Sequence, residues 1–126
     1  MHTCTNFVLT CMDFRFQTTI RDYLVANGFV EDFDLVSYAG SSKNLETVIT
    51  QIVLSNKLHG ATNIHIFHHE ECGAYGLDKT TISNNEEIAI HKADMQKAKA
   101  TIENLIINAK VNLYFVSLDK AVTKLD

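Results

Sequence analysis

Short apolar runs alternate along the chain with longer segments in which apolar residues recur every three or four positions. The apolar runs are rich in β-branched and aromatic residues, so they predict buried strands at 6–10, 33–38, 63–68 and 111–117. The longer segments have helical spacing and predict amphipathic helices at 18–27, 45–58 and 84–110. Strands that alternate with helices in this way favour a parallel sheet covered by helices on both faces.

Turn and capping signals divide the same segments. Asn27-Gly28 and Gly60 are helix stops, and Ser83 with Glu86 three residues later fits a capping box at the start of the last helix. We predict one α/β domain over residues 1–126, with three layers and a mainly parallel four-stranded sheet in the order 2-1-3-4. The pattern leaves residues 118–126 open, as a frayed tail or a short extra element.

Composition narrows the classes of protein that fit this fold. The chain has 126 residues, a formal net charge of −4 and scattered basic residues, so no nucleic-acid or anionic-membrane partner is expected. No apolar run approaches the roughly 18 residues of a membrane span, and the first residues lack the pattern of a signal peptide. We therefore expect a cytoplasmic protein. Its three cysteines argue against a disulfide framework.

Two polar motifs follow the first and third predicted strands. Cys11, Asp13 and Arg15 alternate along an extended segment, so their side chains can share one face. His69 and Cys72 follow the third strand at a spacing that suits a short chelate. Ligands of open α/β sheets bind at the carboxyl ends of strands, where these motifs would meet. Two thiolates and one imidazole suit zinc and leave its fourth position open.

Other assignments compete with this one at several positions. His68 is the alternative ligand if the strand register shifts by one residue. His65 is expected to be a hydrogen-bonded core histidine, whereas His91 is expected at the surface or a helix end. Cys4 is expected to be an unremarkable thiol near the first strand. A redox or phosphatase role for Cys72 is disfavoured, since there is no Cys-x-x-Cys and no arginine follows in its loop.

The two motifs together resemble the paired signature of the β-class carbonic anhydrases. The resembling segments are Cys11-Met12-Asp13-Phe14-Arg15 and His69-Glu70-Glu71-Cys72-Gly73, in that order. The resemblance implies that Cys11, His69 and Cys72 hold a zinc ion. It also implies that Asp13 and Arg15 form the family's dyad. In that dyad the aspartate accepts a hydrogen bond from zinc-bound water or takes the fourth zinc position, and the arginine holds it away from the metal.

The resemblance implies a zinc lyase that reversibly hydrates carbon dioxide to bicarbonate, working as a homodimer or higher homo-oligomer. Two departures are visible. The family's N-terminal helical arm, which contributes a glutamine to the pocket, has no equivalent here, and the Asn-Ala-Gly turn is replaced by Tyr38-Ala39-Gly40. Alternatives are a zinc hydrolase of carbonyl sulfide or carbon disulfide, and a non-catalytic zinc-stabilised dimer module. An intact Asp13–Arg15 pair favours an enzyme.

Overall fold

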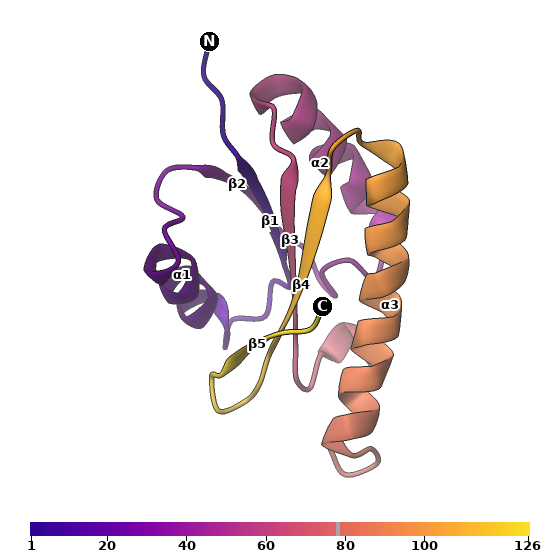
Figure 1. The fold of residues 1–126 in the computed structure, drawn as a ribbon. Coiled ribbons are helices and arrows are strands. Elements are labelled where there is room, and N and C mark those ends of the chain that lie inside the picture. Colours follow the sequence, from indigo (N-terminus) through magenta and orange to yellow (C-terminus); the bar gives the residue numbers. More distant parts are fainter. Residues whose placement is uncertain (78) are drawn as a thin grey trace.

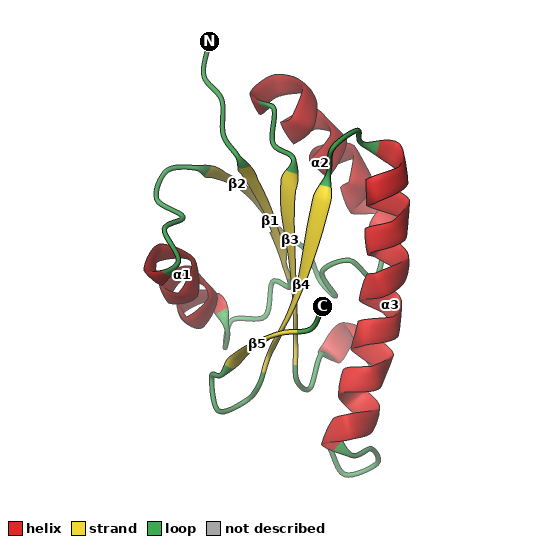
Figure 2. Ribbon diagram, in the orientation of Figure 1, coloured by secondary structure: helices red, strands yellow, loops and turns green. Residues whose placement is uncertain are grey.

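A computed structural model describes residues 1–77 and 79–126 and places one sheet between two layers of helices (Figure 1 and Figure 2). The helices are α1 (Gln17–Ala26), α2 (Leu45–His59), the short 3₁₀ helix η1 (Gly73–Tyr75) and α3 (Asn84–Leu105). The strands are β1 (Asn6–Thr10), β2 (Phe33–Ser37), β3 (Asn63–His69), β4 (Lys110–Val116) and β5 (Val122–Lys124). Helix α1 covers one face of the sheet, and α2 and α3 cover the other.

The sheet has the order β2-β1-β3-β4-β5, and its first four strands are parallel. The predicted three-layer fold and the order of these strands are therefore confirmed. The predicted number of strands was one too low, because β5 returns antiparallel to β4 with Val116 opposite Val122. Ser117 and Ala121 close this turn by a 3.0 Å backbone hydrogen bond. A strand of three residues is too short to show a period of its own.

The strands β1, β3 and β4 are buried on both faces of the sheet, which explains their continuous apolar runs, whereas the edge strands β2 and β5 are partly exposed. Alternate residues such as Phe7, Leu9 and Ile66 enter a core shared with α2 and α3. Their neighbours, including Val8 and Phe67, enter a second core beneath α1. Burial on both faces at about 25 cal/mol per Å² of apolar surface makes these strands the main source of hydrophobic stabilisation.

The ends of α3 show where local signals suffice and where they do not. The capping box is present, since the Ser83 side chain accepts from the Glu86 amide and the Glu86 carboxylate accepts from the Ser83 amide. The helix ends at Leu105, however, rather than continuing to residue 110 as predicted. Ile106 is extended and Asn108 has a left-handed φ of 67°, so the chain reverses without glycine or proline.

Within the described ranges, no helix has the length and apolar character required to cross a membrane.

Candidate metal centre

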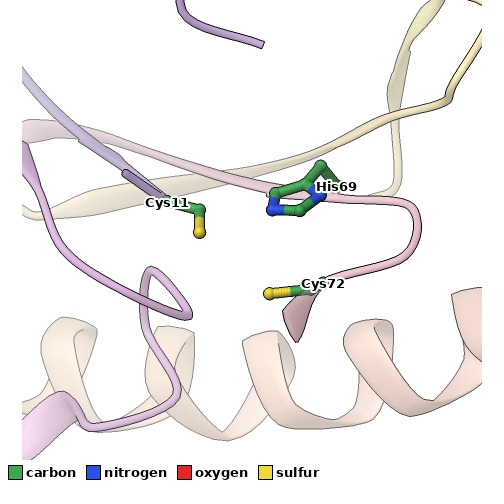
Figure 3. A group of neighbouring side chains, drawn as sticks. All are labelled: Cys11, His69 and Cys72. Carbon is green, nitrogen blue, oxygen red and sulfur yellow. The ribbon is translucent and has the colours of Figure 1, made fainter. Parts of the chain in front are cut away.

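The carboxyl ends of β1 and β3 bring together three side chains that were predicted to meet. Cys11 follows β1, His69 is the last residue of the adjacent parallel β3, and Cys72 lies just beyond it. Their ligand atoms all lie within 4.8 Å of one another, and all three residues are buried. Figure 3 shows the two sulfur atoms and the imidazole facing a common space. Strand pairing thus makes neighbours of two motifs that are distant in the sequence.

The His69 ring is fixed in an orientation suited to metal binding. Its Nδ1 donates to the Glu70 carbonyl at 2.8 Å, and the ring stacks on Phe16 with centroids 4.4 Å apart. A backbone carbonyl can only accept, so Nδ1 carries the proton and Nε2 keeps a lone pair in the neutral ring. Nε2 is buried and has no hydrogen-bond partner among the described residues. An orphaned buried nitrogen is costly in an apolar setting and fits a site for a cation.

His68, the alternative ligand, points to the opposite face of the sheet. Its Nε2 lies 2.7 Å from Ser42 Oγ, and its Nδ1 lies 2.8 Å from Nδ1 of His91 on α3. Side chains alternate along a strand, so neighbouring histidines of β3 cannot both face the cysteines. In the observed register the His69 side chain faces Cys11 and Cys72, and the His68 side chain is buried on the other face of the sheet.

The two cysteines differ in their affinity for a proton. A hydrogen bond from Cys72 lowers the pKa of Cys11, and the Gly40 amide lowers it further. The same hydrogen bond, together with burial, raises the pKa of Cys72. Within the pair, the thiolate is therefore favoured at Cys11 and the proton at Cys72. A divalent cation binding here would release that proton, as thiol ligands require.

The turn after β2 completes the shell around Cys11. Gly40 N lies 3.4 Å from Cys11 Sγ and donates to it. Gly40 has a left-handed φ of 79°, and a Cβ on this residue would lie 3.1 Å from the Ala74 Cβ. Only glycine accommodates both the dihedral and the close approach. The Tyr38-Ala39-Gly40 turn, noted as a departure from the family pattern, thus still delivers a backbone donor to the cluster.

Asp13 and Arg15 form a two-pronged ion pair at the edge of the cluster. Arg15 Nε donates to Asp13 Oδ1 at 3.0 Å and Nη2 donates to Oδ2 at 2.8 Å. These bonds lower the pKa of Asp13 to about 2, so it is a carboxylate at neutral pH. Its Oδ2 lies 3.9 Å from His69 Nε2. An acceptor-only group is therefore held next to the orphaned nitrogen.

Two residues that support this dyad were not identified from the sequence. Gln17 Nε2 donates to the Cys11 carbonyl at 2.9 Å and to the Asp13 carbonyl at 2.8 Å, which fixes the loop after β1. Glu71 accepts from Arg15 through Oε1 at 2.9 Å and through its backbone carbonyl at 3.1 Å. No periodicity marks either residue, since both contacts depend on loop geometry.

A polar network that includes His91 lies behind the cluster against α3. His91 is fully buried, and burial lowers its pKa to about 4, which keeps the ring neutral. Glu87, also fully buried, accepts from the Glu71 amide at 2.5 Å. The expectation of a surface or cap position for His91 is therefore wrong. Its spacing of four residues from Glu87 and from Met95, on the inner face of α3, was the available signal.

The donor set and its surroundings fit zinc on chemical grounds. Two cysteine sulfurs and one imidazole are typical zinc ligands, and three protein ligands leave one tetrahedral position for water or substrate. Hard cations such as Mg²⁺ and Ca²⁺ prefer oxygen ligands and would fit poorly. The hydrogen bond from His69 to Glu70 supplies the outer-shell support that metal-bound histidines require.

Comparisons with known proteins agree with this geometry. The sequence profile of a family described as "Putative carbonic anhydrase" matches residues 1–126. An uncharacterised protein of Rickettsia conorii is 26% identical over 137 residues, a match that covers 99% of this chain and 74% of the relative.

Solved structures share the fold at low sequence identity. A carbonic anhydrase from Streptococcus mutans superposes with a TM-score of 0.72 at 18% identity, covering 99% of this chain and 84% of that one. A match from Sordaria macrospora, described as a tetrameric β-carbonic anhydrase, has a TM-score of 0.62 at 16% identity, with 99% and 82% covered. The family profile spans the whole chain, and the fold is that of β-class enzymes. The chain therefore belongs to the carbonic anhydrase family, as a divergent member of β-class architecture.

Proposed function

We propose that the protein reversibly hydrates carbon dioxide to bicarbonate and a proton, with a zinc ion held by Cys11, His69 and Cys72. The observation that carries the proposal is the orphaned Nε2 of His69, which faces two buried sulfurs beside an ionised aspartate. A zinc ion in such a site lowers the pKa of a coordinated water towards about 7 and so supplies a nucleophile at physiological pH.

Asp13 is proposed to orient the attacking water. Both of its oxygens accept from Arg15, yet a carboxylate has about four lone-pair sites and can accept a further bond. Because its pKa is about 2, Asp13 does not compete for the proton and acts only as an acceptor. Such an acceptor would align the water's lone pair with the carbon of the substrate and reduce the entropy cost of attack.

Arg15 is proposed as the positioning residue that keeps Asp13 in place. Its guanidinium is tied on one side to Asp13 and on the other to Glu71, so both carboxylates restrain it. The ion pair holds the Asp13 carboxylate towards the Arg15 guanidinium and away from the fourth zinc position, which is left for water or substrate. The planar fork of arginine suits this task better than the point charge of lysine.

A homo-oligomer is also proposed, on the basis of apolar side chains beside the centre. Phe14 is 86% exposed and Met12 is 64% exposed, although both lie between Cys11 and Arg15. Large apolar side chains exposed next to a polar site mark an interaction surface. A second copy of the chain that covers this surface would also shield the centre from bulk water.

Three free cysteines fit a reducing, intracellular location.

The experiment is stopped-flow hydration of carbon dioxide, followed with a pH indicator, on protein whose zinc content has been measured. We expect zinc-loaded wild type to accelerate hydration well above buffer, and Cys72→Ser to lose the zinc ion of this centre together with the activity. Asp13→Asn should keep the metal and lose about 10²-fold in rate, the scale of a misaligned reactant. Asp22→Asn is the matched control, because it removes the same charge from the exposed surface of α1.

The outcomes separate the alternatives. Zinc-loaded protein that does not accelerate hydration, with Asp13→Asn equal to wild type, would show a structural zinc module instead. A folded wild type that takes up no zinc at these three residues would overturn the proposal altogether.

A further inference from the structure

A second group of metal-ligating side chains lies at the end of the sheet opposite the candidate metal centre. Cys4 precedes β1, Asp34 is the second residue of β2, and His59 is the last residue of α2. Their ligand atoms lie within 4.8 Å of one another, and each residue is half-buried. In Figure 1 the N-terminal segment and the end of α2 lie together at this end of the sheet. None of these residues takes part in the proposed carbon dioxide chemistry.

The backbone holds the three residues in place independently of any ligand. Cys4 N donates to the His59 carbonyl at 3.0 Å, which ties the first segment to the end of α2. Gly60, with a left-handed φ of 76°, ends that helix directly after His59. Phe7 of β1 pairs with Asp34, which fixes the register of β2 beside the same segment. The cluster is thus built on two strands and a helix end rather than on a mobile loop.

Hydrogen bonds orient the side chains as they do around bound metals. Asp34 Oδ2 accepts from Ser55 Oγ at 2.6 Å and lies 2.7 Å from His59 Nδ1. A histidine whose one nitrogen contacts a carboxylate has its ring orientation and tautomer fixed, the common outer-shell arrangement of metal sites. Both Asp34 and His59 keep a second ligand atom outside these two bonds. Cys4 adds a sulfur, which hard cations do not select.

A second imidazole and an entry route lie beside the group. The exposed His2 ring lies against His59, with the ring centroids 4.8 Å apart. An open cavity of about 240 Å³ is lined by Asp34, Ser55 and His59, among others, and gives an ion access from solvent. One thiol, one carboxylate and two imidazoles would complete a tetrahedral set.

We propose that Cys4, Asp34 and His59, together with His2, form a second binding site for a divalent transition metal, with zinc as the first candidate. Binding exchanges the Cys4 thiol proton for a sulfur–metal bond, and the proton leaves to solvent. The bound ion would link the N-terminal segment to β2 and α2. This site does not depend on the proposed carbon dioxide chemistry and would exist even if the Cys11, His69 and Cys72 cluster had another role.

The test is metal stoichiometry by mass spectrometry after metal-free, reduced protein is dialysed against zinc alone. We expect two zinc ions per chain in wild type, one in Cys4→Ser, one in Cys72→Ser and none in the double variant. With cobalt in place of zinc, Cys72→Ser should keep a thiolate-to-cobalt charge-transfer band that the double variant lacks. His2→Ala should weaken the site by at least the roughly 10- to 100-fold seen on loss of an outer-shell partner.

Further variants keep the test decisive if Cys4→Ser folds poorly. Asp34→Asn and His59→Gln should each lose one zinc, whereas Asp32→Asn, a matched loss of charge just outside the cluster, should keep both. A Cys4→Ser protein that binds as much zinc as wild type, with Asp34→Asn also unchanged, would overturn the proposal. If only Cys72→Ser leaves the zinc content unchanged, the candidate carbonic anhydrase centre fails and the second site stands.

Discussion

His65 of β3 makes the stability of the fold sensitive to acid in a way that can be measured. Its side chain is 5% exposed, Nε2 lies 3.0 Å from Asn6 Oδ1, and Nδ1 lies 2.9 Å from the Tyr114 hydroxyl. The Asn6 amide nitrogen donates to the Asp32 carbonyl, so the amide oxygen of Asn6 is the atom that faces His65, and it accepts from His65 Nε2. His65 Nδ1 is then unprotonated and accepts from the Tyr114 hydroxyl. Both ring nitrogens are therefore used by the neutral form. The expectation of a hydrogen-bonded core histidine is confirmed.

Burial, aided by the charges of Lys124 and Lys110, lowers the pKa of His65 from 6.5 to about 4. The unfolded chain therefore takes up a proton at this residue at a higher pH than the folded one. Below 6.5 the unfolded state binds more protons, so stability falls as the pH falls towards 4 and levels off below that value. At about 1.4 kcal/mol for each difference of one in pKa, the loss is about 3 kcal/mol. The contribution of the lysines is screened, which makes this an upper bound.

The assay is urea unfolding of metal-free, reduced protein, followed by far-ultraviolet circular dichroism between pH 7.5 and 4. We expect His65→Gln to be less stable than wild type at pH 7.5 by about 1 kcal/mol, since glutamine keeps only part of the hydrogen bonding. Wild type should then lose up to about 3 kcal/mol more than the variant on acidification. Comparing the two cancels the contributions of His68 and His91. His2→Gln, which removes an exposed histidine, is the control.

The reasoning about His65 would be refuted if wild type and His65→Gln lost stability in parallel from pH 7.5 to 4. That result would mean that the folded state accepts the proton as readily as the unfolded chain. A change in the slope against urea would instead show that the variant alters the surface exposed on unfolding, and the comparison would then be repeated with His65→Asn.

Three further predictions concern single side chains. Arg15→Lys should leave zinc content unchanged but reduce hydration by about 10²-fold, because lysine cannot hold both Asp13 oxygens. Gly40→Ala should destabilise the fold by more than about 1 kcal/mol in urea unfolding and weaken zinc binding in a chelator competition, given its left-handed φ and the nearby Ala74. Ser83→Ala should cost about 1 kcal/mol, and a loss close to zero would contradict the cap.

The sequence predicted the parts of this protein that depend on regular repetition. Four strands and their order follow from apolar runs that alternate with helices, and the grouping of Cys11, His69 and Cys72 follows from where those strands end. Alternation along a single strand also distinguishes His69 from His68 once the register is known. These predictions hold because a parallel sheet imposes the same geometry on any sequence that forms it.

Other features depend on contacts that no repeat encodes. The end of α3 is set by the chain reversal through Asn108, which has a left-handed backbone. Asparagine tolerates this conformation but occurs in many others, so its presence in the sequence does not predict the turn. Glu71 forms an ion pair with Arg15, which comes from a loop distant in the sequence. Gln17 acts through backbone carbonyls, which every residue has. Such contacts appear only when loops from different strands are placed together.

The division of the candidate centre between β1 and β3 has a consequence for the order of events during synthesis. As the chain emerges, Cys11 is available before His69 and Cys72, because residues 12–68, which include α1, β2 and α2, separate them in the sequence. A lone thiolate holds a zinc ion poorly, so the ion cannot guide early folding. Capture of the proposed zinc ion would then be a late maturation step, and the metallated fraction of newly made protein would report how many chains have paired β1 with β3.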